Sequence, residues 1–487
     1  RFNLETILNE VDYIGNMTRA LNWIICDANF GMLPRDIEIA KAIRHFKDTT
    51  GYPKKIHLYL AKNVTARNLE IADILGDMIY PVMSLQSMEP EVLKNIKRDN
   101  ISIDTYVQYH EKYQKMGSET FSELIVPLPG ETFESHISSL KKLGEFGTEI
   151  IFNHNLRMLP GAEINSKETR LKHKMRTKFR LIHGDSGIYK SPFGSGINAF
   201  EYEESVRETE SMSEQELYIL RKLHFLFEIC WNIGVYKPLL WFVGLYKIFP
   251  IEIFMYLLSF QQKPLNGLNS NENQIKLFFD EFDKSSNDEW FDSRDDIETY
   301  FEDNEHFDKL VNQEYEKLNV LFSVVFLKEY KEDFDKVLHN YLSSKTEIDT
   351  NLLDHITNFN FSWFPKVDYS AKETEIFLPE SILNLNEDNV ETYRDSKKKI
   401  CFRLINSPSR RELKKSIDKM KEETLSKILN AKSPEYINGN CIKVRERKKC
   451  LKSGQSSQYG IKKDMYPIRE FKKSLKNKFL WSKFFYF

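Results

Sequence analysis

Cysteine is scarce in this chain of 487 residues, and its placement argues against two kinds of protein. The five cysteines lie far apart, at positions 26, 230, 401, 441 and 450. They are too few and too scattered for a disulfide framework, so a reducing cytoplasm is the expected compartment. Cys441 and Cys450 match no usual zinc-ligand spacing. Cys26 ends an apolar run, and we expect it to be buried and unreactive.

Glycine and proline are also sparse, at 19 and 16 residues, and neither sign of charge dominates. The 70 Lys and Arg residues nearly balance the 72 Asp and Glu residues, so net charge indicates no particular partner and no nucleic acid is expected. Few glycines and prolines beside many aromatic residues are typical of a helix-rich globular protein. The length leaves room for two or three domains.

No apolar run is long enough to cross a membrane. Residues 236–260 are very apolar, but charged residues and a proline interrupt them, at Lys237, Lys247, Pro250 and Glu252. Each uninterrupted piece is shorter than the roughly 20 residues that a spanning helix needs. We expect two helices there, either buried or facing a partner. The chain starts at Arg1 with an amphipathic helix and no leader, which reads as a polypeptide entered midway.

The stretch Leu21–Asp36 organises the N-terminal part of the chain. The apolar run Leu21–Cys26 predicts a buried strand. A polar loop with Asp27, Asn29 and Gly31 follows, and Pro34 with Asp36 then begins a helical pattern. In an α/β fold this end of a strand is where ligands bind. The alternative is an ordinary polar turn after a core strand.

Four more apolar runs recur at a spacing of roughly 30 residues and alternate with helical patterns. These predicted strands are Lys55–Leu60, Tyr80–Leu85, Phe121–Val126 and Glu149–Leu156. The spacing indicates parallel strands joined by helical crossovers. A doubly wound sheet and an incomplete (β/α) barrel would both give this pattern, and periodicity does not choose between them.

The C-terminal half is less regular. From about 165 to 210 the pattern loosens into charged sequence with Gly and Ser. Helices are expected again from Ser213, which forms a capping-box sequence with Glu216. Helical sequence continues to about residue 345, and the Lys-rich part, 396–449, is expected to be a charged helical segment.

Two charged stretches invite specific interpretations. Residues 274–305 are acidic and aromatic, and Asp283, Ser285 and Asn287 faintly resemble a calcium loop. The central glycine is missing and the spacing fails, so a solvated acidic helical face is expected. The tail, residues 441–487, is basic and ends in aromatic residues, so contact with an anionic membrane or with nucleic acid is one interpretation. A flexible terminus, or an untemplated end from a shifted reading frame, is the favoured one.

Three motifs occur in a fixed order, at residues 27–32 (DANFGM), 84–98 (SLQSMEPEVLKNIKR) and 124–135 (LIVPLPGETFES). Together with the later Leu-Pro-Gly at 159–161, they resemble the radical S-adenosylmethionine (SAM) enzymes. The likeness is strongest to the branch whose members often carry a cobalamin-binding domain. It covers about residues 1–260.

The resemblance implies a partial (β/α)6 barrel that lacks its first strand, so the five predicted strands would be its second to sixth. A mainly helical C-terminal region would follow. The expected division is a barrel over 1–165, a linker and apolar helical cover over 166–262, a charged helical region over 263–440 and a basic, flexible tail over 441–487. The helices between 213 and 260 would cover the open side of the barrel and exclude water.

The family holds a 4Fe-4S cluster on the three cysteines of a CxxxCxxC loop, and this chain contains no such triplet. Arg1–Glu10 looks like the helix that follows the loop, so the ligands are expected just upstream. Without three thiolates there is no one-electron source to cleave SAM, and this chain alone is expected to be inactive. The expected cofactors are SAM, the cluster with its ligands missing from this chain, and possible cobalamin through an upstream domain.

Given this resemblance, several residues suit the polar parts of SAM. Asp27, aided by Asn29, suits the ammonium group, because a carboxylate accepts charge-assisted hydrogen bonds. Ser84 and Gln86 suit the ribose hydroxyls or the carboxylate. Arg98 suits the SAM carboxylate, a partner that arginine binds bidentately. The alternative for Arg98 is a cation at the exposed end of a helix.

Other residues are expected near the adenine. Pro129 and Gly130 would let the backbone approach the ring closely. Glu131 either takes part or only caps the following helix. Leu156 and the two residues after it would lend backbone groups to the adenine edge. His154 is expected to be a core or rim histidine and not a ligand.

The leading hypothesis is a fragment of a radical SAM enzyme. The intact enzyme would cleave SAM reductively to a 5′-deoxyadenosyl radical, for hydrogen abstraction or cobalamin-assisted methyl transfer. Its substrate would be an unknown small or lipid- or glycan-like molecule, with an external electron donor. The alternative is a non-catalytic remnant that binds SAM or a partner. An ordinary hydrolase or isomerase is disfavoured, because no nucleophile–base or metal constellation is evident.

Overall fold

The computed structural model describes residues 2–27, 29–60, 66–79, 84–98, 102–115, 120–190, 194, 196–312, 314–315, 317–363, 374–404 and 441–444. The chain divides into two compact units. Unit 1 comprises Arg1–Phe179 and Glu203–His224, and unit 2 comprises Arg180–Tyr202 and Phe225–Phe487. The expected four-part division of the chain stays a prediction.

Unit 1 alternates strands and helices. Its elements are α1 (Leu4–Met17), β1 (Asn22–Ile24), α2 (Asp36–Thr50), β2 (Lys55–His57), α3 (Ala66–Leu75), a 3-10 turn (Gly76–Met78), α4 (Pro90–Asn95), α5 (Ile103–Lys115), β3 (Phe121–Val126), α6 (Phe133–Glu145), β4 (Ile150–Asn155), a 3-10 turn (Glu163–Asn165), α7 (Lys167–Lys172) and α8 (Glu214–Leu226). The last two residues of α8 belong to unit 2.

The strands of unit 1 pair in parallel. β1 pairs with β2, and β3 pairs with β4 over six residues, with Phe121 opposite Ile150. The third predicted strand, Tyr80–Leu85, lies partly outside the described residues, but its flanks pair in the same sense: Ile79 with Ile56, and Gln86 with Leu124. Parallel pairing with helical crossovers confirms the α/β class.

The β3–β4 pair has one buried and one more exposed face. Along β3 burial alternates, and Ser122, Leu124 and Val126 are buried. Residues opposite each other in parallel strands point to the same side. The Phe121 and Phe152 ring centroids lie 4.9 Å apart, and Phe152 stacks on His154 at 6.4 Å. Phe121 and Glu123 therefore share the more exposed face with Phe152 and His154.

The loop between β1 and α2 is fixed by its own sequence. The backbone N–H groups of Gly31 and Leu33 donate to the Asp36 carboxylate at 2.8 and 2.9 Å. Gly31 has a φ of 93°, and a Cβ there would lie 2.2 Å from Asn68 Oδ1, so only glycine fits. Helix α2 begins at Asp36, which confirms the predicted start.

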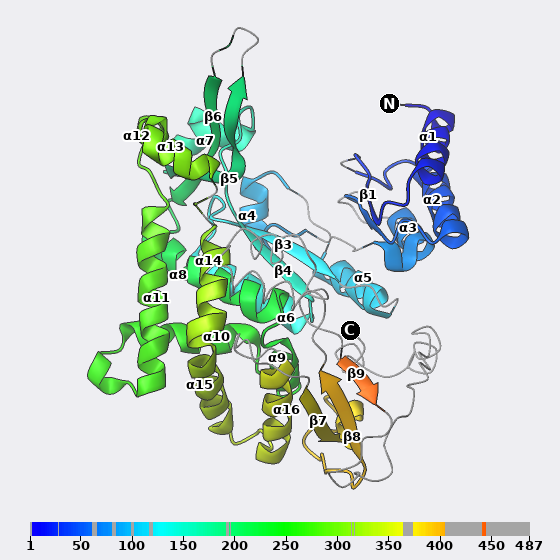
Figure 1. Cartoon of the computed structure of the whole chain (residues 1–487), viewed down its shortest axis with the longest axis vertical. Helices are drawn as coiled ribbons and strands as arrows, with labels where there is room; N and C mark the ends of the chain where they lie inside the picture. Colours follow the sequence, from blue (N-terminus) through cyan, green and yellow to red (C-terminus); the bar gives the residue numbers. More distant parts are fainter. Residues whose placement is uncertain are drawn as a thin grey trace. The chain divides into compact units, whose positions relative to one another are not determined.

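A long hairpin replaces the loosely patterned segment expected between 165 and 210, so that expectation is wrong over most of its length. β5 (Arg176–Lys190) and β6 (Gly196–Glu208) form a two-stranded sheet, labelled in Figure 1. The sequence missed it because charged residues interrupt the alternation of both strands. The capping box predicted at Ser213 is confirmed, since Glu216 N–H donates to Ser213 Oγ and Ser213 N–H donates to the Glu216 carboxylate.

Unit 2 is mainly helical. Its elements are a π-helical turn (Phe227–Asn232), α9 (Lys237–Gly244), α10 (Pro250–Leu258), 3-10 turns (Ser259–Gln262, Leu265–Gly267), α11 (Ser270–Asp288), α12 (Arg294–Glu302), α13 (Asn304–Val311), α14 (Leu318–Val325), a second π-helical turn (Phe326–Tyr330), α15 (Lys331–Ser343), α16 (Thr350–Trp363), β7 (Thr374–Pro379), a 3-10 turn (Glu380–Asn384), β8 (Lys399–Leu404) and β9 (Cys441–Val444).

The two helices predicted between 236 and 260 are confirmed as α9 and α10. In the part of the chain that the structure describes, no helix has the length and apolarity to cross a membrane. Asp283, Ser285 and Asn287 lie within the continuous helix α11, which fits a helical face and not a calcium loop.

Strands stand where a charged helix was expected after residue 396. β8 pairs antiparallel with β7 on one side and with β9 on the other. The helix prediction is therefore wrong over β8 and β9. The residues between them, and those after 444 in the basic tail, lie outside the described part. The error arises because all three strands pair with segments distant in the chain, which composition does not reveal.

A dense aromatic core holds the helices of unit 2 together. Phe278 on α11 is fully buried, and its ring centroid lies 5.6–6.0 Å from four others, those of Phe225, Phe322, Phe326 and Phe334. Rings at such separations in tilted or edge-to-face arrangements stabilise a core beyond their burial.

Candidate functional site

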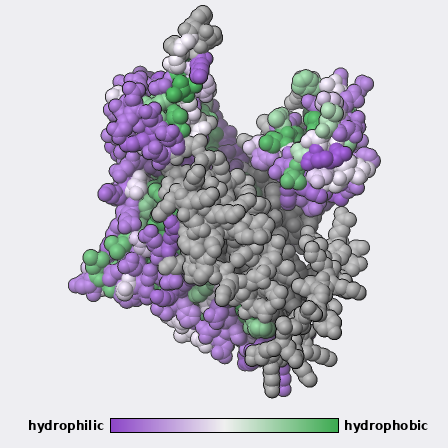
Figure 2. Space-filling view, viewed as in Figure 1, coloured by the Kyte–Doolittle hydropathy of each residue, from purple (hydrophilic) through white to green (hydrophobic). Residues whose placement is uncertain are grey.

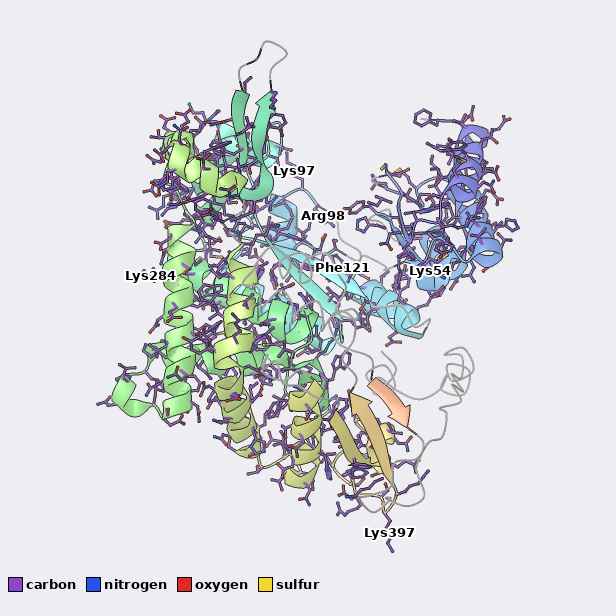
Figure 3. All side chains as sticks on the ribbon, in the orientation of Figure 1. Lys54, Lys97, Arg98, Phe121, Lys284 and Lys397 are labelled. Atoms are coloured by element: carbon purple, nitrogen blue, oxygen red, sulfur yellow. The ribbon has the colours of Figure 1, made fainter. Side chains whose placement is uncertain are left out.

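Glu123 on β3 gathers polar groups from three other segments of unit 1. Ser84 Oγ donates to one carboxylate oxygen at 2.6 Å, and His154 Nε2 lies 3.5 Å from the other. Arg98 Nη2 donates to the Ser84 carbonyl oxygen at 2.8 Å. Figure 3 labels Arg98, which follows α4, and Phe121, at the start of β3. We call Ser84, Arg98, Glu123 and His154 the Glu123 cluster.

Gln86 joins the cluster through the backbone. Its N–H donates to the Glu123 carbonyl oxygen at 2.9 Å, and its own carbonyl oxygen accepts from Ile125 N–H at 2.9 Å. Its φ of 61° lies in the left-handed region, which is strained for a residue with a side chain. This conformation ends the strand segment and turns the chain toward α4.

Arg98 is half-buried beside the Glu123 carboxylate. Burial lowers the pKa of Arg98, and the charge of Glu123 opposes that shift. Guanidinium stays charged at any physiological pH, so the cluster presents a cation and an anion side by side. Its contact with Ser84 distinguishes Arg98 from a free cation at a helix end.

The loop after β3 is held tightly in place. Asn95 Nδ2 donates to the Pro129 carbonyl oxygen at 3.0 Å. Gly130 has a φ of 81°, and a Cβ there would lie 2.7 Å from the same Asn95 nitrogen. Glycine is therefore required by both conformation and space.

Replacing Gly130 with alanine is expected to weaken the SAM binding that the sequence motifs predict about three- to tenfold, since Asn95 must shift and the left-handed backbone becomes strained by roughly 1–2 kcal/mol. Gly161→Ala is the matched control. Its φ is 79°, but nothing lies within 4 Å of the added Cβ, so it shares only the strain. Calorimetric titration with SAM measures both variants. Equal affinity in the two would show that the crowding at Gly130 is irrelevant to binding.

Glu131 is fully buried, and both of its carboxylate oxygens have partners. One accepts from Leu128 N–H at 3.1 Å, and the other lies 3.1 Å from His136 Nδ1. The side chain therefore holds the loop, and Thr132 is the N-cap of α6, in a capping box with Ser135.

Leu156 is buried, and both of its backbone groups are paired. Its N–H donates to the Val126 carbonyl oxygen, and its carbonyl oxygen accepts from Val206 N–H, each at 2.9 Å. Its side chain packs in a cluster with Val92, Leu128, Met158 and Val206. A second lone pair of the carbonyl oxygen is the group it could offer to a ligand.

Asp27 and Asn29 lie together at the end of β1. The Asp27 carboxylate accepts from Asn29 N–H at 2.8 Å, and Asp27 is exposed. This contact does not join them to the Glu123 cluster. Among the described residues, then, the predicted SAM residues form two groups: Asp27 with Asn29, and the remainder around Glu123 and the loop after β3.

Cys26 is exposed, so the expectation that it is buried is wrong. Ile24, two residues earlier in β1, is 70% exposed. Figure 2 shows scattered apolar surface on the N-terminal elements. Leu21, Ile24, Met32 and Tyr59 are exposed in this part of the chain.

Sequence reasoning missed Glu123 and Asn95, and it expected no ligand-binding role for His154. A signal for Glu123 existed: it is a charge inside the otherwise apolar run Phe121–Val126, alternating with the buried Ser122 and Leu124. Such a residue must face a ligand, a partner or water. No signal pointed to Asn95, whose role depends on the path of a loop more than 30 residues away.

The residues that the structure describes do not fit an iron–sulfur cluster. Such a cluster needs three thiolates held close together. The two cysteines whose side chains are described, Cys26 and Cys230, lie in different units, and burial raises the pKa of Cys230. Throughout the described residues, no three His, Cys, Asp or Glu side chains are grouped so as to hold a metal.

Residues 2–143 match the model of the Radical SAM superfamily, which confirms the resemblance seen in the motifs. The chain is similar to two curated methyltransferases. One is the 2-(S-pantetheinyl)-carbapenam-3-carboxylate methyltransferase of Streptantibioticus cattleyicolor, 32% identical over 219 residues, 44% of this chain and 31% of that protein.

The other is the cobalamin-dependent radical SAM methyltransferase TokK of Streptomyces tokunonensis, 32% identical over 181 residues, 36% of this chain and 26% of that protein. The chain thus spans about a third or less of these relatives. Among solved structures, the radical SAM methyltransferase TsrM of Kitasatospora setae, with tryptophan and a SAM analogue bound, is 15% identical with a TM-score of 0.31, over 39% of this chain and 38% of that one.

Proposed function

We propose that this chain is the SAM-binding part of a cobalamin-dependent radical SAM methyltransferase. The observation that carries the proposal is the Glu123 cluster, where Ser84, Arg98 and His154 meet a carboxylate at the more exposed face of parallel strands. The match of residues 2–143 to the superfamily and the two methyltransferase relatives support it.

The proposed architecture is a partial (β/α)6 barrel. Five parallel segments in chain order support it: β1, β2, the segment flanked by Ile79 and Gln86, β3 and β4. In such folds ligands bind where the carboxyl ends of the strands meet. Asp27, Pro129 and Leu156 follow such ends, whereas Glu123 lies within β3.

The Glu123 cluster matches the sugar and amino-acid parts of SAM. A carboxylate accepts hydrogen bonds from two neighbouring hydroxyls, so Glu123, with Ser84 and Gln86 beside it, is assigned to the ribose. Arg98 is assigned to the SAM carboxylate. These are assignments by chemistry: an anion for hydroxyl donors, and a fork of N–H donors for a carboxylate.

The remaining predicted residues take the other parts of SAM. Asp27 and Asn29 are assigned to the ammonium group of SAM, which the exposed Asp27 carboxylate would bind. The backbone at Pro129 and Gly130 and the Leu156 carbonyl oxygen are assigned to adenine. Glu131 holds the loop after β3 in place and makes no contact with SAM.

The 4Fe-4S cluster of the family supplies the electron for SAM cleavage when it is bound, and its cysteine ligands are not among the residues of this chain. The role proposed for this chain is to bind and orient SAM. The methyl acceptor is an unidentified small or lipid- or glycan-like molecule, the electron donor is external, and the location is cytoplasmic. Membrane contact through the basic tail stays a prediction.

The test is SAM binding by the full chain, measured by calorimetric titration. One SAM per chain is expected, with competition by S-adenosylhomocysteine and none by ATP. Loss of affinity in Ser84→Ala with retained folding supports the assigned site. No binding by the folded wild-type chain would reject the proposal.

A non-catalytic SAM-binding remnant is the second candidate, favoured by the absence of a cysteine triplet from this chain. The coding DNA upstream of Arg1 discriminates between the enzyme and the non-catalytic remnant. An in-frame CxxxCxxC supports the enzyme, and the extended chain, reconstituted anaerobically with iron and sulfide, should then yield 5′-deoxyadenosine. A cysteine-to-alanine variant is the control for that assay.

A further inference from the structure

A chain of three side chains, Glu131, His136 and His224, connects the loop after β3 to helix α8. Glu131 and His136 are fully buried, and His136 Nδ1 lies 3.1 Å from a Glu131 carboxylate oxygen. His136 Nε2 lies 3.0 Å from Nε2 of His224 on α8. All three residues belong to unit 1. The ring pair therefore joins parts of the chain 88 residues apart.

The proton arrangement follows from the partners. His136 Nδ1 faces a carboxylate, so it carries the hydrogen and donates to Glu131. One of the two facing Nε2 atoms then donates to the other, which requires at least one ring to be neutral. The second Glu131 oxygen accepts from Leu128 N–H at 3.1 Å, so the chain ends on the backbone of the loop.

We infer that His224 is a positioning residue for the loop Pro127–Thr132, acting through His136 and Glu131. Without the His224 ring, His136 Nε2 would lose its hydrogen-bond partner. The His136 ring would then be held less firmly, and so would the Glu131 carboxylate that it contacts. Since the loop carries Pro129 and Gly130, its looseness would reach the proposed adenine contact. Only this last consequence rests on the proposed function.

A second hydrogen bond, from the segment just before α8 to the same loop, supports the inference. Ser211 Oγ, just before α8, donates to the Glu131 carbonyl oxygen at 2.8 Å. From the other side, Asn95 of α4 holds the Pro129 carbonyl oxygen. The loop is thus held between α4 and the segment 211–224, and His224 is the most distant residue in that connection.

The charged and titratable groups facing His224 are His136 of α6, Arg221 of α8 and His154 of β4. Burial, followed by these neighbours, holds the pKa of His224 well below its usual range. His224 is therefore neutral at pH 7. A local opening that exposes the ring restores its ordinary affinity for protons, so acid below about pH 6.5 favours the open loop.

Hydrogen-exchange mass spectrometry of the full chain tests the inference. In His224→Leu, protection of peptides over 127–132 is expected to fall about two- to tenfold, the size expected for one hydrogen bond, with β3 unchanged. His224→Gln, which keeps an N–H donor, should lose less. His45→Gln, an exposed histidine on α2, is the matched control. Unchanged protection in a folded His224→Leu overturns the inference.

The pH profile separates positioning from mere packing. Wild-type protection at 127–132, corrected for intrinsic exchange, should decline from pH 7 to 5, and His224→Gln should show no such decline. If His224→Leu does not fold, the pH profiles of wild type and His224→Gln test the inference instead. The same decline of protection with pH in both proteins would overturn it. SAM titration is a separate arm. A wild type that fails to bind SAM rejects the proposed function and leaves the exchange result standing.

Discussion

Replacing Glu123 with glutamine is expected to weaken SAM binding about 10- to 100-fold. The substitution keeps the shape of the side chain and removes its charge, so a carboxylate that accepts from Ser84 and, as proposed, from two ribose hydroxyls becomes a single amide oxygen. Hydrogen bonds to charged groups contribute about 1.5–3 kcal/mol, which corresponds to this change in affinity. Calorimetric titration of the full chain measures it.

Glu134→Gln is the matched control for this substitution. Glu134 is exposed in the first turn of α6, so the same change of charge there should leave the affinity for SAM within about twofold. Thermal unfolding of both variants checks that the fold is retained. Equal affinities of Glu123→Gln and wild type would remove Glu123 from the site.

Replacing Lys331 with alanine is expected to destabilise unit 2 by about 3–5 kcal/mol. The Lys331 side chain is fully buried, is paired with Asp335, and lies 4.8 Å above the Tyr236 ring and 5.2 Å above the Phe361 ring. Tyr236 Oη donates to the same Asp335 oxygen at 2.6 Å. Alanine would leave a carboxylate buried without its cation, beside a cavity.

Burial lowers the pKa of Lys331 and raises the pKa of Asp335, while their mutual attraction opposes both shifts. The loss of stability in Lys331→Ala therefore comes mainly from the uncompensated Asp335 charge. We expect the double substitution Lys331→Met with Asp335→Leu to recover most of the lost stability. Lys336→Ala, at an exposed position on the same helix, should cost less than about 0.5 kcal/mol. Urea unfolding followed by fluorescence of the unit 2 tryptophans measures all three. A loss no larger in Lys331→Ala than in Lys336→Ala would contradict the prediction.

Much of unit 1 was predictable because its signals are local. The strands at Asn22–Ile24, Lys55–His57, Phe121–Val126 and Ile150–Asn155 lie within the predicted apolar runs. Two helix starts were also predicted from local signals, that of α2 at Asp36 and that of α8 from the capping box of Ser213 and Glu216. These features depend on neighbours a few residues apart, so composition and spacing are sufficient.

Strands that find distant partners were not predictable. The hairpin β5–β6 was missed because its alternation is interrupted by charge, and β7–β9 because its charged composition suggested a helix. Cys26 was misjudged for a related reason: an apolar run predicts a strand, but not how many of its faces are covered. Burial is set by the elements that pack on a strand, and these come from elsewhere in the chain.

The sequence by itself determined the α/β order, the loop glycines and the motifs that indicate SAM, since each is written in residues close together. Only the tertiary structure decided that Glu123 meets Ser84, 39 residues away, and that His224 reaches the loop after β3. The reason is physical: a hydrogen bond needs its atoms within about 3 Å, and pairing of strands and packing of helices bring such distant residues together.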